Sequence, residues 1–175
     1  FIPAYTWPFP VVSPDYAGWE DCLDMSEYAQ KIALELPKDK AWYLIGHSMG
    51  GYVALALAKE FPEQVKSVVM LNSTAMADSE EKKLNRNKTM EFLQKLGTEA
   101  FIGPFVPNLF SKDFVEQHSS IIRKLIERYQ HIPASGLVAA SKAMRDRPAG
   151  LEFLTSTQIP FLFIHGDLDT LVPQI

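Results

Sequence analysis

The sequence predicts an α/β fold with a mostly parallel, doubly wound sheet and a helical insertion between two of its strands. Two strand-sized apolar runs, 41–45 and 65–71, flank a helical pattern of small residues, 52–61. This alternation of strand and helix is typical of a parallel sheet whose crossover helices cover its faces. A third apolar run, 159–165, follows only after a long stretch of helices and loops, so that stretch interrupts the core.

The composition is that of a globular domain and excludes several classes of function. Of the 175 residues, 47% are hydrophobic and 22% charged, and the net charge of −4 comes from interspersed acids and bases, which argues against nucleic-acid binding. No apolar run approaches the ~20 residues of a membrane span. The single cysteine, Cys22, excludes an internal disulfide and favours a reducing compartment, so we expect a cytoplasmic protein.

The N-terminal region is predicted to lead into the core. Residues 11–18 indicate a short strand that runs into a turn, and Asp15 there is expected to anchor the loop through local backbone N–H groups rather than to act in catalysis. Residues 26–36 have apolar side chains at helical spacing. We expect Ser26 to cap this helix and Pro37 to stop it.

The centre of the predicted site is the turn after the strand 41–45. The chain reads Gly46-His47-Ser48-Met49-Gly50 and continues directly into the small-residue helix. Strand, G-x-S-x-G and helix in this order predict a nucleophile elbow, a tight turn that exposes the serine hydroxyl. Glycine is expected at Gly46 and Gly50 because a Cβ at either position would collide with the neighbouring strand or helix.

Ser48 is therefore the candidate nucleophile. The Met49 N–H, at the positive end of the helix dipole, is the candidate oxyanion donor. His47 occupies the variable position of the motif, and its side chain is expected to point away from the Ser48 proton. A serine hydroxyl also needs an adjacent base and a carboxylate that orients this base.

The elbow with its flanking strand and helix resembles that of the α/β-hydrolase superfamily. Pro14, Asp15 and Gly18 also fit a loop pattern of that family, although Trp19 stands where the family usually has histidine. The resemblance implies a triad in the chain order serine, acid, histidine. No strand followed by a His-Gly pair precedes Val11, so the second oxyanion donor of the family is missing and we expect the sequence to be the middle of a longer hydrolase.

The insertion is identified by the same resemblance as a helical cap over 75–153, with the core formed by 1–74 and 154–175. The strand 65–71 before it is rich in β-branched residues and apolar from Val68 to Leu71, which predicts cover on both faces. Three cap helices are expected: from Ser79 to Leu96 with Gly97 ending it, from Ser111 to Tyr129, and from Pro133 to Met144. Four cap phenylalanines either line a substrate pocket or pack within the cap: Phe101, Phe105, Phe110 and Phe114.

The candidate acid follows the last predicted strand, 159–165. The chain continues from Gly166 to Pro173 in a pattern similar to the family's G-x-x-D-x-x-x-P loop, whose fourth position is Asp169. Asp167 is the nearby alternative, and we expect it instead to bond the loop backbone.

No histidine follows Asp169 before the sequence ends. We therefore expect the base to lie beyond the given chain and the 175 residues alone to be inactive. The four histidines that are present have other expected roles, in the elbow, on the apolar face of a cap helix, in a cap loop and at the end of a strand: His47, His118, His131 and His165.

The resemblance implies a serine hydrolase that acts on a carboxylic ester or a related acyl compound, with no oligomeric state implied. C–C hydrolases and haloperoxidases of the family use the same triad and remain alternatives. A non-catalytic ligand-binding protein on the same fold is the alternative from another class. No residue cluster has metal-ligand spacing and no strand leads into a phosphate loop, so we expect neither a metal nor a cofactor.

Overall fold

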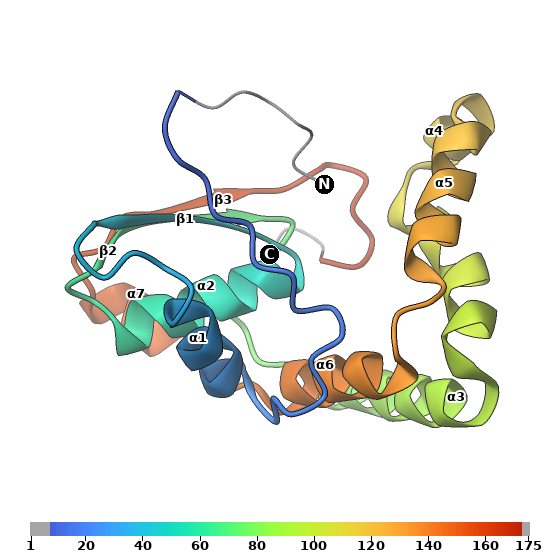
Figure 1. The fold of residues 1–175 in the computed structure, drawn as a ribbon, viewed down its shortest axis with the longest axis horizontal. Coiled ribbons are helices and arrows are strands. Elements are labelled where there is room, and N and C mark those ends of the chain that lie inside the picture. The colour runs from blue at the N-terminus through green and yellow to red at the C-terminus, as the bar shows by residue number, and fades with distance from the viewer. Residues whose placement is uncertain (1–7, 173–175) are drawn as a thin grey trace.

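A three-stranded parallel sheet forms the centre of the computed structural model, which describes residues 8–172 (Figure 1). Its strands are β1 (Trp42–His47), β2 (Val65–Leu71) and β3 (Phe161–Ile164), in the order β1-β2-β3. Leu71 pairs with His47 on one side and with Ile164 on the other, so all three strands end side by side. The predicted α/β class with a parallel sheet is confirmed.

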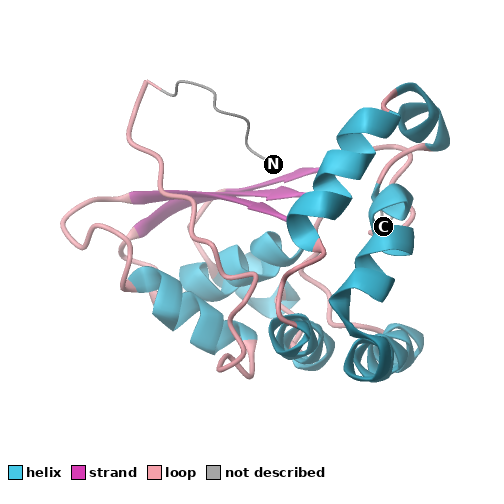
Figure 2. Ribbon diagram, turned by 45° about the vertical axis from the view of Figure 1, so that its right-hand side comes forward, coloured by secondary structure: helices cyan, strands magenta, loops and turns pink. Residues whose placement is uncertain are grey.

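Three helices cover one face of this sheet: α1 (Met25–Ala33), α2 (Met49–Glu60) and α7 (Leu151–Ser156) (Figures 1 and 2). The small residues of α2, such as Ala54 and Ala58, let the helix approach the strands closely. Val68 and Met70 of β2 point into this layer and are fully buried. The alternating side chains of the strands thus place one half of their apolar surface in the core.

The opposite face of the sheet is open in the described part of the chain. Tyr43 and Ile45 of β1 are 73% and 52% exposed, and Leu162 of β3 is 55% exposed. Val69 of β2 lies between them and is only half-buried. The expected cover of β2 on both faces is therefore wrong for residues 8–172, because helices pack on one side only.

Two N-terminal predictions are also wrong. Residues 11–18 form no strand: Val11 and Val12 are exposed between Pro10 and Pro14, which lack the N–H groups that a ladder needs. The first helix is capped by Asp24 instead of Ser26, since the Asp24 carboxylate accepts the N–H of Glu27 at 2.9 Å. The Glu27 carboxylate in turn accepts the N–H of Leu23, which makes a reciprocal capping arrangement. Residues 1–7 lie outside the described part.

Between β2 and β3 the chain forms a helical arm that starts with α3 (Glu80–Phe105) and returns through α6 (Ala134–Asp146), which packs along α3 (Figure 1). Ser79 caps α3 as predicted. Gly97, with φ of +79°, ends the first helical segment as predicted, but a second segment then continues across Pro104. This second segment ends in a 3₁₀ turn (Val106–Leu109).

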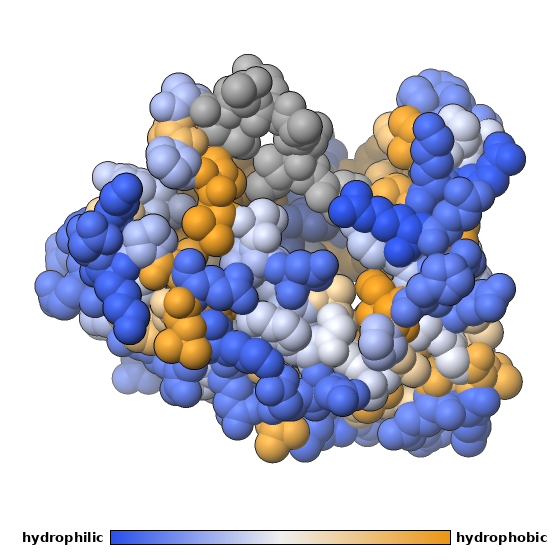
Figure 3. Space-filling model, in the orientation of Figure 1, coloured by the Kyte–Doolittle hydropathy of each residue, from blue (hydrophilic) through white to orange (hydrophobic). Residues whose placement is uncertain are grey.

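The tip of the arm consists of α4 (Lys112–Gln117) and α5 (Ser119–Tyr129), which project beside a notch in the molecular surface (Figure 3). The single helix predicted from Ser111 onward is wrong, because His118 adopts a non-helical conformation (φ −126°, ψ 36°) between the two. His118 is exposed and lies against the Phe114 ring, rather than on a buried face. Within residues 8–172, no helix is long and apolar enough to cross a membrane.

Candidate active site

Ser48 occupies a strained turn between β1 and α2. Its φ of +51° and ψ of −118° lie outside the regions that L-residues ordinarily adopt. Such a conformation costs on the order of 1–3 kcal/mol and persists only where the surroundings enforce it. The turn sits at the carboxyl edge of the sheet, where ligand sites of open α/β sheets are found.

The backbone of Ser48 is held on both sides. Its N–H donates to the Leu71 carbonyl at 3.0 Å, which extends the β1–β2 ladder by one residue. Its carbonyl accepts the Gly51 N–H at 3.0 Å and the Ser73 hydroxyl at 2.8 Å. Three hydrogen bonds on the two peptide groups that flank the Ser48 Cα thus enforce the unfavourable dihedral angles.

Close packing explains the glycines of the elbow, with one difference from the prediction. A Cβ on Gly46 would overlap the backbone of Gly50 and lie 2.5 Å from the Gly51 nitrogen, so the expected collision at Gly46 is confirmed. A Cβ on Gly50 would meet only the Tyr16 hydroxyl, at 3.2 Å, so the collision with strand or helix expected there is wrong. The second crowded position is Gly51, whose Cβ would overlap the fully buried Ser73.

Met49 is the first residue of α2 and is half-buried. Its N–H belongs to the first turn of the helix, where backbone donors have no intrahelical acceptor. The donor is thus available beside Ser48, at the end of the helix that favours negative charge.

Asp169 lies in the loop after β3, at the same edge of the sheet. One carboxylate oxygen, Oδ1, accepts the N–H groups of Leu171 at 2.9 Å and Val172 at 3.0 Å. The other, Oδ2, accepts the side-chain amide of Asn72, which follows β2. Asp169 therefore makes the loop-backbone bonds that were expected of Asp167, which is exposed.

The electrostatics favour an ionised Asp169. Burial alone would raise its pKa, but the hydrogen bonds from Val172, Leu171 and Asn72 outweigh this effect, and the pKa lies below its ordinary value. The positive charge of a protonated His165 acts in the same direction. A carboxylate that is charged at neutral pH and fixed by three donors is suited to orienting an imidazolium.

The histidines occupy four separate places. In residues 8–172, no hydrogen bond joins a histidine to the Ser48 hydroxyl. His47 ends β1, and partial desolvation lowers its pKa while the charge of Asp169 opposes this shift. His165 follows β3 with a buried Nδ1 that has no hydrogen-bond partner in the described chain. His131 is exposed beside Gln130.

Two residues of the N-terminal loop make contacts that bear on the site, Asp15 within the loop and Tyr16 at the elbow. Asp15 accepts the N–H of Ala17 at 3.3 Å, as expected for a loop anchor. Tyr16 places its hydroxyl beside Gly50, and burial raises the pKa of this hydroxyl, so it stays protonated at neutral pH. No sequence motif marked Tyr16 as a neighbour of the elbow.

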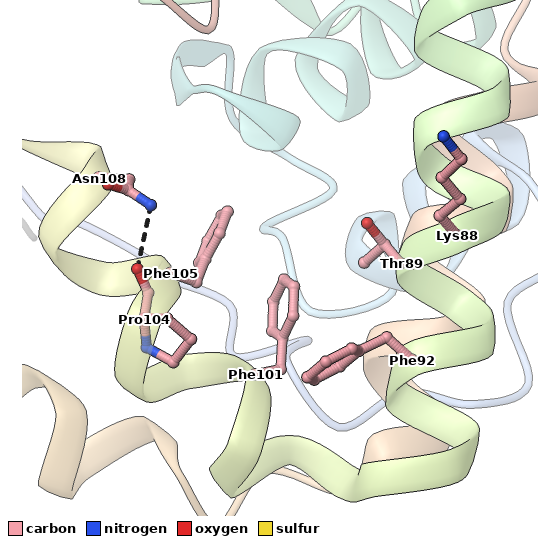
Figure 4. Close-up of a pocket in the computed structure, with 7 residues that line it drawn as sticks. All are labelled: Lys88, Thr89, Phe92, Phe101, Pro104, Phe105 and Asn108. Atoms are coloured by element: carbon pink, nitrogen blue, oxygen red, sulfur yellow. Dashed lines mark hydrogen bonds between the residues drawn. The ribbon is translucent and has the colours of Figure 1, made fainter.

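The arm contains an apolar cavity of about 350 Å³ between the two segments of α3 (Figure 4). Phe92, Phe101 and Phe105 form most of its wall, and the Phe101 and Phe105 rings stack at 4.8 Å. Phe110 and Phe114 stack on each other at 5.1 Å, and together with Phe101 they pack against the small buried cluster of the arm. Packing within the arm is therefore confirmed for Phe101, Phe110 and Phe114, whereas a role in lining a substrate pocket stays a prediction.

A buried ion cluster joins the arm to the core, and the sequence patterns did not indicate it. Asp78, just before α3, contacts Arg86 at 2.5 Å and Arg147, just after α6, at 2.7 Å. The Arg147 guanidinium also lies 3.9 Å from the centre of the Tyr52 ring on α2. Both stems of the arm are thereby fixed to the helix that begins at the elbow.

Among residues 8–172, no group of three His, Cys, Asp or Glu side chains could hold a metal ion.

The fold and the strained serine define a class, and comparison with known families identifies it. Residues 13–175 match the family model of the alpha/beta hydrolase fold. The chain therefore belongs to the alpha/beta hydrolase family.

Several characterised hydrolases are similar to this chain. A thermophilic esterase from Thermogutta terrifontis superposes with a TM-score of 0.78 at 27% identity, covering 87% of this chain and 57% of that one. A pimeloyl-[acyl-carrier protein] methyl ester esterase of Yersinia enterocolitica is 25% identical over 87% of this chain and 60% of its own length. A 2-hydroxy-6-oxononadienedioate/2-hydroxy-6-oxononatrienedioate hydrolase of a Pseudomonas species is 24% identical over 98% of this chain. The chain spans about 60% of the length of these two relatives.

Proposed function

We propose that this chain carries the nucleophile and the acid of a serine hydrolase that cleaves a carboxylic ester or a related acyl compound. The observation that carries the proposal is Ser48 at φ +51°, held by three backbone-directed hydrogen bonds at the edge of the sheet where Asp169 also lies. Backbone strain of this kind at a serine is hard to explain unless the serine takes part in a reaction.

In the proposed mechanism Ser48 attacks the substrate carbonyl and transfers its proton to a histidine that follows Asp169 outside the 175 residues. Asp169 orients this base and stabilises its charged form. The Met49 N–H donates to the oxyanion, and a second donor comes from outside the chain. The histidine passes this proton to the leaving group as the acyl-enzyme forms. It then accepts a proton from the water that attacks the acyl-enzyme and returns it to Ser48 as the acid is released.

The similarity to two esterases favours an ester substrate. The Pseudomonas relative supports C–C bond hydrolysis as the second candidate, because that reaction uses the same triad. We further propose that residues 75–153 act as a cap, whose cavity lined by Phe92, Phe101 and Phe105 receives an apolar acyl group.

The first test is labelling of the full-length protein with a fluorophosphonate, beside its Ser48→Ala and Ser119→Ala variants. Ser119 is an exposed serine at the start of α5 and serves as the matched control. Labelling that disappears only in Ser48→Ala supports an activated Ser48. A native protein that is not labelled would favour the ligand-binding alternative.

A second test compares the full-length protein with the isolated chain 1–175. We expect hydrolysis of p-nitrophenyl esters only by the full-length protein, because the proposed mechanism takes its base and one oxyanion donor from outside residues 1–175. The loss of one such donor alone typically lowers the rate by about 100- to 1000-fold. Turnover by the isolated chain that depends on Ser48 would contradict this expectation.

A further inference from the structure

Three consecutive residues at the end of β2, Leu71 to Ser73, hold both halves of the candidate site. The Leu71 carbonyl accepts the Ser48 N–H, and the Ser73 hydroxyl donates to the Ser48 carbonyl at 2.8 Å. Between them, the Asn72 side-chain amide donates to Asp169 Oδ2. One short segment thus fixes the nucleophile's backbone and the acid's carboxylate relative to each other.

The backbone of Asn72 is shaped for this contact. Its φ of +43° is one of only two positive values among the non-glycine residues of the described chain, the other being that of Ser48. Its N–H donates to the Ile164 carbonyl at 2.8 Å, which ties the turn to the end of β3. A Cβ on Gly166 would lie 3.6 Å from the Asn72 amide nitrogen, so the side chain passes directly beside the loop that carries Asp169.

The donors around Asp169 determine which of its acceptor sites stays open. A carboxylate oxygen offers about two lone-pair sites. Both sites of Oδ1 are taken by the N–H groups of Leu171 and Val172. On Oδ2, Asn72 takes one site, and among residues 8–172 no other donor takes the second. The remaining acceptor site of the carboxylate is therefore on the oxygen that Asn72 holds.

We propose that Asn72 is a positioning residue that holds Asp169 Oδ2 so that its remaining lone pair accepts the N–H of the catalytic histidine. The role rests on the proposed function, in which Asp169 is the acid of the triad. Asn72 acts only through Asp169. Because the same segment also holds the Ser48 backbone, the distance between nucleophile and acid is set by residues 71–73.

The test measures the rate of fluorophosphonate labelling against pH in the full-length protein. Asn72→Gly removes the amide and suits the positive φ, so the turn is retained. We expect labelling to slow by about 10- to 100-fold, as is typical when a hydrogen bond that orients a site residue is lost. The slowing should be smaller than that of Asp169→Asn, which removes the acid itself.

A second variant, Asn72→Asp, keeps the size of the side chain and places a second carboxylate against Asp169. Added negative charge stabilises the protonated base, so the acidic limb of the pH profile should move upward by on the order of one pH unit. A side chain that does not contact Asp169 would not move this limb. The control is Gln30→Glu, the same amide-to-acid change on an exposed residue of α1, which should leave rate and profile unchanged.

The outcomes separate this role from the proposed function. A native protein that is not labelled overturns the proposed function and the role of Asn72 with it. A labelled native protein whose Asn72→Gly variant reacts at the native rate overturns the role of Asn72 alone. If Asn72→Gly does not fold, as judged by circular dichroism, the Asn72→Asp variant decides instead. An acidic limb at the same pH as in the native protein would then overturn the role of Asn72.

Discussion

Replacement of Asp78 by alanine should be among the most destabilising changes outside the elbow. The Asp78 side chain is 1% exposed and contacts Arg86 and Arg147 at 2.5 and 2.7 Å. Arg147, 5% exposed, also donates to the carbonyls of Met144 at 2.6 Å and Met76 at 2.9 Å. The variant leaves a buried guanidinium without its counter-ion while both stems of the arm still converge on it.

The magnitude follows from the burial of the pair. Removal of one partner from a buried ion pair costs about 3–5 kcal/mol, because the uncompensated charge stays in a medium of low polarity. The neighbouring pair of Arg145 and Asp146, at 2.7 Å, is a matched control because its side chains are 25% and 44% exposed. Exposed pairs contribute about 0–1 kcal/mol, so Asp146→Ala should change stability little.

The assay is urea unfolding of the full-length protein, followed by circular dichroism. We expect Asp78→Ala to lower the midpoint at an unchanged slope, which marks a loss of stability rather than a change in the unfolded state. The Asp78→Ala, Arg147→Ala double variant should lose less than the sum of the single variants, because the two residues interact directly. A loss in Asp78→Ala no larger than that in Asp146→Ala would refute the reasoning.

Three further predictions concern the elbow and the acid. Gly46→Ala should lower the free energy of unfolding by at least about 1–3 kcal/mol and abolish labelling, because the new Cβ meets backbone atoms. Gly103→Ala is the control: no atom lies within 4 Å of its Cβ, so it should be neutral or stabilising in the same unfolding assay. Ser48→Gly should abolish labelling yet raise the free energy of unfolding by about 1 kcal/mol, because glycine adopts the positive φ without strain. A Ser48→Gly variant that is no more stable than Ser48→Ala would contradict this. The pKa of Asp169 is lower in the folded protein than its ordinary value of about 4, so the ionised carboxylate stabilises the fold at pH values above about 4. This contribution is lost as the pH falls through the lower pKa of the folded state. Thermal melts at neutral and acidic pH should therefore show a smaller loss on acidification in Asp169→Asn than in the native protein.

Local sequence patterns predicted the features that depend on near neighbours. The strand 65–71, the elbow turn, the cap at Ser79 and the break at Gly97 follow from side chains within a few residues of each position. The same reasoning failed where alternatives compete locally. Asp24 and Glu27 together made a better cap than Ser26, and one non-helical residue, His118, divided an otherwise continuous apolar stripe.

The candidate site was only partly predictable. Ser48 and Asp169 were found because each stands in a motif with fixed spacing. Asn72, Ser73 and Gly51 were missed as a group, because their contacts join segments that the sequence keeps far apart. Nothing in the local pattern around a lone Asn-Ser pair indicates that one side chain reaches a carboxylate and the other a strained carbonyl.

The sequence by itself determined the class of fold, the turn that carries the serine and the position of the candidate acid, because periodicity, glycine placement and motif spacing are properties of short segments. The tertiary structure alone decided which side chains hold these groups in place. The parallel sheet brings the ends of β1, β2 and β3 to one edge, so Ser48, Asn72 and Asp169 all lie there and Asn72 contacts Asp169. Likewise, the return of α6 along α3 brings Arg147 to Asp78, since a buried charge needs a partner that only the folded chain supplies.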